Sequence, residues 1–122
     1  MFNEKEKNNR IETLIGDKCT VIGSIQGEGL MKIDGTIEGD INLQDDIIID
    51  INALCKSNIN CKNATINGKV EGNIICENTL TIESYGKVTG NITVKNLVIK
   101  EGGILDGKCT MVMSKEPSEI LS

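Results

Sequence analysis

A five-residue phrase recurs along this chain: an aliphatic residue, any residue, glycine, any residue and a second aliphatic residue. Four complete copies lie at residues 21–25, 37–41, 70–74 and 88–92. Two degenerate copies complete the set, because residues 55–59 carry serine in place of glycine and residues 105–109 end in cysteine. Successive central positions are 16, 18, 15, 18 and 17 residues apart. A unit this short cannot bury its apolar face alone, so the repeat predicts a solenoid of six stacked units.

Two further tracks of alternating aliphatic residues keep the register of this phrase. The track before each copy consists of the pairs Met31 and Ile33, Ile47 and Ile49, Ala64 and Ile66, Leu80 and Ile82, and Leu97 and Ile99. The track after each copy consists of Ile41 and Leu43, Ile59 and Cys61, Ile74 and Cys76, Ile92 and Val94, and Cys109 and Met111. Alternation with period two places successive side chains on opposite faces of a strand. Each unit is therefore expected to form three short strands, and the chain an all-β, parallel β-helix of about six triangular coils.

Composition and charge exclude several function classes. The chain has one phenylalanine, one tyrosine and no tryptophan, which suits a narrow aliphatic interior, and its net charge of −5 argues against a nucleic-acid partner. It has no histidine, which removes the commonest general base and metal ligand. We therefore expect no enzyme activity, no catalytic residues, no cofactor, no metal and no nucleotide. No apolar run is long enough to span a membrane and no signal peptide is evident, so a cytoplasmic location is expected.

The five cysteines are interpreted mainly as packing residues. Cys55, Cys61, Cys76 and Cys109 occupy aliphatic slots of the repeat and are predicted to lie in the core. Disulfides are not expected in a cytoplasmic protein, and an oxidised pair of Cys61 and Cys76 is the alternative. Cys19 shares a corner position with glycines of later units and is predicted to be exposed.

Outward positions of the repeat are interpreted as structural or solvated. Asn58, Asn73 and Asn91 share one outward register in three consecutive coils, which predicts a ladder of stacked amides. The carboxylates at outward and corner positions, such as Glu38 and Glu71, are interpreted as a solvated surface.

The ordered series of phrases resembles the bactofilin family. The resemblance rests on residues 13–16, 20–23, 27–30 and 33–41, and on the closing Gly107-Lys108-Cys109. It covers residues 13–111 and implies a right-handed β-helix that polymerises end to end without nucleotide. It also implies membrane-associated filaments or sheets that act as a scaffold in cell shape, wall synthesis, division or motility. The chain departs from the family at Ile104 and Leu105, where members often carry an aromatic residue near the closing cysteine.

An open solenoid exposes unpaired strand edges and a cross-section of its core at both ends, and such an end can template another chain. Residues 1–12 and 112–122 are predicted to be flexible tails that leave the ends accessible. The partner expected at each end is a second copy of this chain, forming a filamentous homopolymer. The predicted contact residues are Leu14, Ile15, Val21 and Ile25 at the N-terminal end, and Ile99, Leu105 and Met111 at the C-terminal end.

The first residues resemble the short membrane-targeting segment of many bactofilins. Met1 and Phe2 form an apolar tip, followed by the cations Lys5 and Lys7. The resemblance implies a peripheral location at the inner face of the cytoplasmic membrane, whereas a plain leader is the alternative. Single contacts of this size are weak, but a filament presents many of them together.

Two other functions compete with a filament. A monomeric β-helical adaptor would bind cell-envelope partners through a flat face of the rod, and its solution mass would reveal it. Left-handed β-helix acyltransferases use similar aliphatic and glycine repeats, but the missing histidine and the absence of a long insertion argue against an enzyme.

Overall fold

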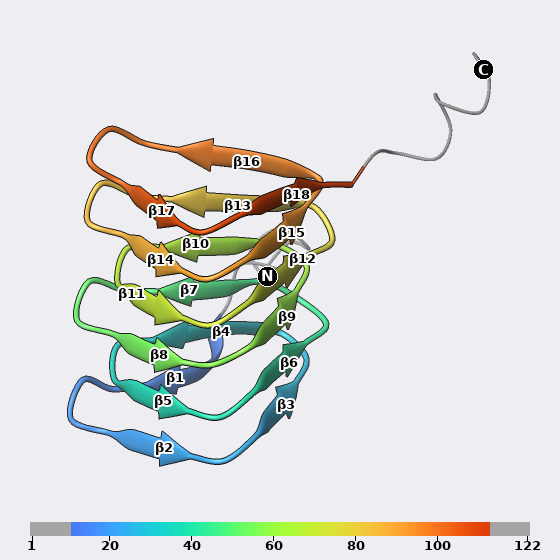
Figure 1. Cartoon of the computed structure of the whole chain (residues 1–122). Helices are drawn as coiled ribbons and strands as arrows, with labels where there is room; N and C mark the ends of the chain where they lie inside the picture. Colours follow the sequence, from blue (N-terminus) through green and yellow to red (C-terminus); the bar gives the residue numbers. More distant parts are fainter. Residues whose placement is uncertain (1–10, 113–122) are drawn as a thin grey trace, which may run out of the picture.

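The computed structural model describes residues 11–112, which form eighteen short strands and, within that range, no helix (Figure 1). The strands belong to three parallel sheets of six, so the predicted all-β solenoid of six coils is confirmed. Sheet A consists of β1 (Ile11–Ile15), β4 (Leu30–Ile33), β7 (Ile47–Ile49), β10 (Ala64–Ile66), β13 (Thr79–Ile82) and β16 (Asn96–Ile99). Sheet B consists of β2 (Thr20–Ile22), β5 (Thr36–Glu38), β8 (Leu54–Lys56), β11 (Lys69–Glu71), β14 (Lys87–Thr89) and β17 (Ile104–Asp106). Sheet C consists of β3 (Ile25–Gly27), β6 (Ile41–Leu43), β9 (Ile59–Cys61), β12 (Ile74–Cys76), β15 (Ile92–Val94) and β18 (Cys109–Met111).

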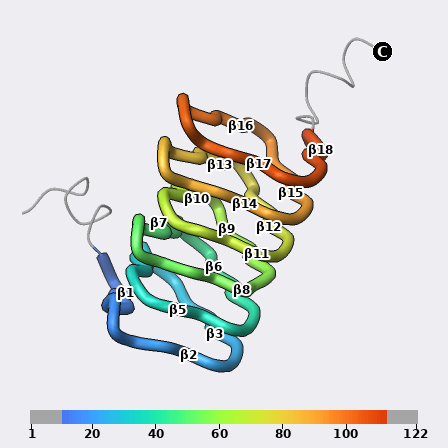
Figure 2. The backbone as a smooth tube through the Cα atoms, turned by 60° about the vertical axis from the view of Figure 1, so that its left-hand side comes forward, coloured from blue at the N-terminus to red at the C-terminus, as the bar shows by residue number. Residues whose placement is uncertain are grey.

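One coil is built from one strand of each sheet in turn. Each strand pairs with the strand three places further along the chain, so the coils stack in chain order from β1 to β18 (Figure 2). The first and last described coils therefore lie at opposite ends of the rod.

The core consists of inward side chains stacked in columns. The column through Ile33, Ile49, Ile66 and Ile82 is typical, since each residue is the Cα partner of the next and all four are fully buried. Four more columns run through Met31, Ile37, Ile41 and Leu43, one for each remaining inward position of a coil. Apolar side chains stack at the strand spacing in every column, which is the packing that the period-two tracks predicted, although their sizes vary in the column of Met31, Ile47, Ala64 and Leu80.

Three of the four cysteines predicted to be core residues are buried. Cys55 follows Ile37 in its column, and Cys61 lies next to Cys76 in the column below Val94. Cys109 is exposed, so its predicted burial was wrong. It occupies an inward slot, but it belongs to the last described coil, and no further coil of residues 11–112 covers it. Cys19 is exposed, as expected.

The central glycine of the phrase forms the corner between sheets B and C. Gly72 has φ of +147°, and a Cβ there would collide with the carbonyl oxygen of Ser57 in the coil below. Glycine is required because the coils approach so closely and because other residues rarely adopt this φ. Ser57 is the exception in this column: it is buried at 4% exposure, and its Oγ has no hydrogen-bond partner among the described residues.

The predicted asparagine ladder exists with a different bonding pattern. Asn58 Oδ1 accepts a hydrogen bond from the backbone N–H of Asn73 at 3.0 Å. Asn73 Oδ1 does the same for Asn91 at 3.0 Å, and Asn91 Oδ1 for Lys108 at 3.3 Å. Each side chain therefore bonds the backbone of the next coil rather than the next amide. The ladder uses corner N–H groups that would otherwise be left to solvent.

The strands begin earlier than predicted. Ile11 and Glu12, expected in the N-terminal tail, are the first residues of β1, where Ile11 pairs with Leu30 and the register shifts before Thr13. This aliphatic partner in the second coil explains the extension. Val112, expected in the C-terminal tail, follows β18 and donates its N–H to the Val94 carbonyl at 2.7 Å. The rest of both predicted tails lies outside the described residues.

Candidate interfaces at the two ends of the solenoid

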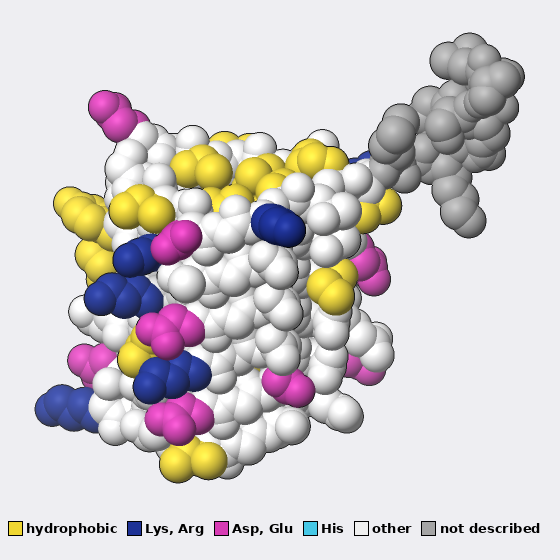
Figure 3. Space-filling model, viewed as in Figure 1, with side chains coloured by type: hydrophobic (Ala, Val, Ile, Leu, Met, Phe, Trp, Pro, Cys, Tyr) yellow, Lys and Arg dark blue, Asp and Glu magenta, His cyan; other side chains and the backbone are white. Residues whose placement is uncertain are grey.

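The core columns are open at the C-terminal end. Ile82 is 0% exposed, whereas Ile99, the next residue in its column, is 44% exposed. Met111 is the last residue in the column of Val94 and is 51% exposed. Leu105 is half-buried. Figure 3 shows apolar side chains gathered across this end, over β16 and β18. All three predicted residues therefore share one apolar end face, which we call the C-terminal face.

The N-terminal end is open to a smaller extent. Val21 and Ile25 are half-buried inward residues of the first coil, but Ile15 is buried at 9% exposure. Leu14 pairs with Lys32 on the outward register and is 60% exposed, so it lies on the outer surface of sheet A rather than on the core cross-section. The structure thus brings three of the four predicted residues together into an N-terminal face, and Leu14 stands apart from them.

Sequence reasoning missed several residues of these faces. Thr13 and Gly27 complete the inward columns of the first coil, and Leu97 and Cys109 complete those of the last. Leu97 and Cys109 belong to tracks that the repeat had already defined, so extending each column to its last member would have found them. Thr13 and Gly27 carry no aliphatic side chain and give no such signal.

The first and last strands of each sheet also have an edge on which no described strand pairs with the backbone. The strands β1, β2 and β3 are the first in their sheets, and β16, β17 and β18 are the last, so each of the six has a single neighbour among the described strands. An edge of this kind offers N–H and C=O groups to a further strand. The register shift in β1 makes the N-terminal edge less regular than the C-terminal one.

Two buried thiols contact each other in the interior. The Sγ atoms of Cys61 and Cys76 lie 3.6 Å apart, a distance that fits a thiol hydrogen bond and no disulfide. This contact and burial raise the pKa of Cys61, and burial raises the pKa of Cys55 to about 12. Both thiols therefore stay protonated and unreactive, which agrees with their interpretation as packing residues.

The corner between sheets A and B carries acidic side chains. Asp50 accepts the backbone N–H of Ile51 and pairs with Lys32 at 3.3 Å, and these contacts lower its pKa. Partial desolvation raises the pKa of the neighbouring Asp34. Across residues 11–112 no three acidic or cysteine side chains gather into a possible metal site. The corner is a solvated surface stabilised by two ion pairs, the second of them between Lys100 and Glu83 at 3.5 Å.

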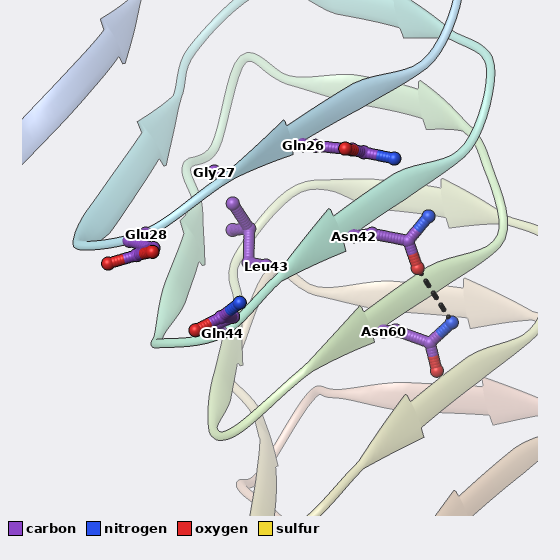
Figure 4. Close-up of a pocket in the computed structure, with 7 residues that line it drawn as sticks. All are labelled: Gln26, Gly27, Glu28, Asn42, Leu43, Gln44 and Asn60. Carbon is purple, nitrogen blue, oxygen red and sulfur yellow. Dashed lines mark hydrogen bonds between the residues drawn. The ribbon is translucent and has the colours of Figure 1, made fainter.

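A hollow of about 400 Å³ lies on the outer surface of sheet C near the N-terminal end (Figure 4). Its lining includes the amides of Gln26, Asn42 and Asn60, and Asn60 Nδ2 donates to Asn42 Oδ1 at 3.0 Å. It holds no pair of acid and base groups. Glu28 is the one ionisable side chain of this lining, and the neutral amides around it supply no partner acid, base or nucleophile.

The predicted membrane-targeting residues Met1, Phe2, Lys5 and Lys7 lie outside the described residues. Within residues 11–112 the structure contains no helix suited to crossing a bilayer.

Fold and ends together define a parallel β-solenoid whose core is left open at both termini of the rod. Sequence comparison gives the family: a profile described as "Bactofilin: Polymer-forming cytoskeletal" matches residues 13–110, and the chain belongs to the bactofilin family. It is therefore a member of a polymer-forming cytoskeletal family, in agreement with the expectation that it is not an enzyme.

Individual relatives support this assignment. The chain is similar to bactofilin BacO of Myxococcus xanthus, with 26% identity over 112 residues, covering 92% of this chain and 89% of that protein. It is also 26% identical over 104 residues to bactofilin BacP of the same organism, covering 85% of this chain but only 43% of BacP. Among solved structures it resembles the bactofilin of Thermus thermophilus reconstructed in double helical filaments, with a TM-score of 0.70 at 18% identity. That match covers 80% of this chain and 98% of the other.

Proposed function

We propose that this chain assembles end to end, without nucleotide, into filaments whose junctions are made by the N-terminal and C-terminal faces. The observation that carries the proposal is the difference in burial within single core columns. Inward residues are buried in the four central coils and become exposed only where the stack stops, as at Ile99 and Met111. A further coil, supplied by another molecule, would cover them as the central coils cover one another.

The physical gain at a junction comes from both side chains and backbone. Covering a half-exposed aliphatic side chain contributes about 1 kcal/mol, so several columns closed together contribute several kcal/mol. The open strand edges gain hydrogen-bond partners at the same time. Contacts that repeat without closing on themselves produce a filament. The membership in a polymer-forming family supports this assembly.

The proposed site of action is the inner face of the cytoplasmic membrane. Met1 and Phe2 would enter the lipid surface while Lys5 and Lys7 approach anionic headgroups, and a filament would add many such weak contacts into firm binding. A filament held there can serve as a scaffold for proteins of cell shape, wall synthesis, division or motility. The resemblance to the family supports this role.

Electron microscopy and sedimentation of the purified chain test the proposal. Filaments are expected after treatment with a nucleotide-hydrolysing enzyme, because neither face uses a nucleotide. Anionic liposomes should bind these filaments, and deletion of Phe2 should reduce binding while leaving filaments intact. A monodisperse monomer at all concentrations would instead favour the adaptor function.

A further inference from the structure

Two sulfur-bearing side chains contact each other at the open C-terminal end of the solenoid. The thiol of Cys109 donates a hydrogen bond to the thioether of Met111, with 3.4 Å between Sγ and Sδ. Both residues belong to β18 and are two positions apart, so the alternation of the strand points them to the same, inward side. Both side chains are exposed. Two soft donor atoms therefore lie together on the C-terminal face, open to solvent.

The other cysteines of the described residues do not offer such a pair. Cys61 and Cys76 also contact each other, but both are buried, and that contact together with burial raises the pKa of Cys61. Cys55 is buried as well. Cys19 is exposed, but it lies between β1 and β2 in the first coil, at the opposite end of the rod. A soluble reagent or ion that binds two sulfur atoms therefore finds them, within residues 11–112, at the C-terminal face.

A thiol and a thioether together favour a soft metal ion. Thiolate and thioether sulfur are ligands that select Cu(I), whereas a structural Zn²⁺ takes four ligands, mostly cysteine and histidine. No three histidine, cysteine, aspartate or glutamate side chains gather anywhere in the described part of the chain, so a zinc site is not formed there. A metal–thiolate bond is about 2.3 Å long, so two sulfur atoms can hold one ion up to about 4.6 Å apart. The separation of 3.4 Å between Cys109 Sγ and Met111 Sδ fits this limit.

We propose that Cys109 and Met111 bind one Cu(I) ion, and that the bound ion blocks the junction made by the C-terminal face. When the ion binds, the S–H bond of Cys109 breaks, an S–Cu bond forms and the proton passes to solvent. Met111 donates a lone pair of its thioether, and the ion remains Cu(I) throughout. The binding site concerns the single subunit, whereas the block of the junction rests on the filament formation proposed above.

The place of the two sulfur atoms links the ion to assembly. Cys109 follows Ile92 in one core column and Met111 follows Val94 in another, and both columns end there among the described residues. An ion held between the two sulfur atoms occupies space into which inward side chains of the next molecule would pack. Ion binding and assembly therefore compete for the same two side chains, and each weakens the other by the same factor.

Competition with a coloured chelator measures the site on single subunits. The full chain, kept below its assembly concentration, is titrated with Cu(I) against bicinchoninate in ascorbate and without oxygen. Wild type should bind one ion per chain and release one proton. Met111→Leu keeps an apolar side chain of similar size and should bind at least tenfold more weakly, and Cys109→Ala at least 100-fold. Cys19→Ala removes the other exposed thiol and is the matched control, which should bind like the wild type.

Each result of the titration decides the sulfur site. Equal affinity in the wild type and Met111→Leu would overturn the pairing of thiol and thioether. Binding that is lost in Cys19→Ala and kept in Cys109→Ala would place the ion at the other end of the rod and overturn the site. Urea unfolding of the ion-free variants should match the wild type, because both side chains are exposed.

Sedimentation and electron microscopy test the block of the junction. One equivalent of Cu(I) should raise the concentration needed for wild-type filaments at least tenfold, and Cys109→Ala should assemble equally with and without the ion. Unchanged assembly of a wild-type chain that binds the ion would overturn the block. A chain that forms no filaments in either condition would overturn filament formation itself, and the block with it, whereas the titration of subunits decides the sulfur site independently.

Discussion

Ile82 and Ile99 are Cα partners in neighbouring strands and point into the same core column, yet Ile82 is fully buried and Ile99 is 44% exposed. The two residues have the same chemistry and the same place in the repeat. Their difference in burial arises because a coil covers Ile82, whereas no coil of the described residues covers Ile99. The last described coil therefore exposes side chains that have the chemistry and direction of core residues.

A corner glycine should be far less replaceable inside the stack than at its end. Gly72→Ala forces a methyl group into the carbonyl oxygen of Ser57, so it should lower the free energy of unfolding by about 2–4 kcal/mol. Gly23 has a similar φ of +129° but nothing within 4 Å, so Gly23→Ala should cost only about 1 kcal/mol, from backbone strain. Urea unfolding of both variants measures the difference. Equal losses would show that the close approach of coils does not matter.

Removal of a buried hydroxyl should stabilise the solenoid. Ser57 Oγ is buried without a hydrogen-bond partner in the described part of the chain, and such a group costs about 1–3 kcal/mol. Ser57→Ala should therefore raise the free energy of unfolding by about 1 kcal/mol. Ser84→Ala, at an exposed corner, is the control and should change little. A loss of stability in Ser57→Ala would mean that an ordered water molecule satisfies the hydroxyl.

The reactivity of the Cys109 thiol should show whether the C-terminal face is covered in filaments. In a non-polymerising variant, a maleimide should modify the exposed Cys19 and Cys109, whereas Cys55, Cys61 and Cys76 should react only after unfolding. Filament formation should protect Cys109, which lies on the C-terminal face, and leave Cys19 reactive. Mass spectrometry of labelled peptides gives the measurement. Equal labelling of Cys109 in filaments and in subunits would place the junction elsewhere.

Buried thiols should make the fold sensitive to alkaline pH. Burial raises the pKa of Cys55 from 9.0 to about 12, so the unfolded chain loses this proton at a lower pH than the folded chain does. The stabilisation is complete below pH 9 and is lost as pH rises from 9 towards 12, by at most about 1.4 kcal/mol per pH unit. Cys55→Val should remove the contribution of Cys55 and keep that of Cys61, whose pKa is also raised, so the variant should lose less stability over this range; valine fits because Val70 and Val88 fill the same column. Urea unfolding between pH 8 and about 11, with a reducing agent, compares the two chains. Parallel pH curves would contradict the burial of the thiol.

The repeat predicted most of the fold because a parallel solenoid uses the same local rule in every coil. The alternation of residues such as Ile47 and Ile49 determines which side chains point inward, and the strand neighbours follow from the spacing. Cys109 shows where this rule stops, because its slot is inward but its burial depends on a further coil above the last described one. The repeat pattern shows whether a side chain points inward. Burial of that side chain also requires a neighbouring coil on each side.

The end faces were predicted less well than the core for related reasons. Leu14 was chosen for its apolar side chain, but it alternates with the inward Ile15 and therefore points outward. The hollow on the outer surface of sheet C gave no sequence signal, since it depends on how side chains from three different coils lie together. The hydrogen bonds of the asparagine ladder likewise required the actual distance between coils.

A pair of substitutions on one strand tests the end-to-end junction most directly. Ile99 and Val98 are neighbours in β16 and are both 44% exposed, but Ile99 belongs to the open core column and Val98 lies on the outer surface. Ile99→Arg should abolish filaments, or raise the concentration needed for assembly by roughly 100-fold, a loss of about 3 kcal/mol. Val98→Arg should assemble like the wild type, and both variants should unfold as the parent subunit does. Filaments in Ile99→Arg at the wild-type concentration, seen by electron microscopy and sedimentation, would contradict the account.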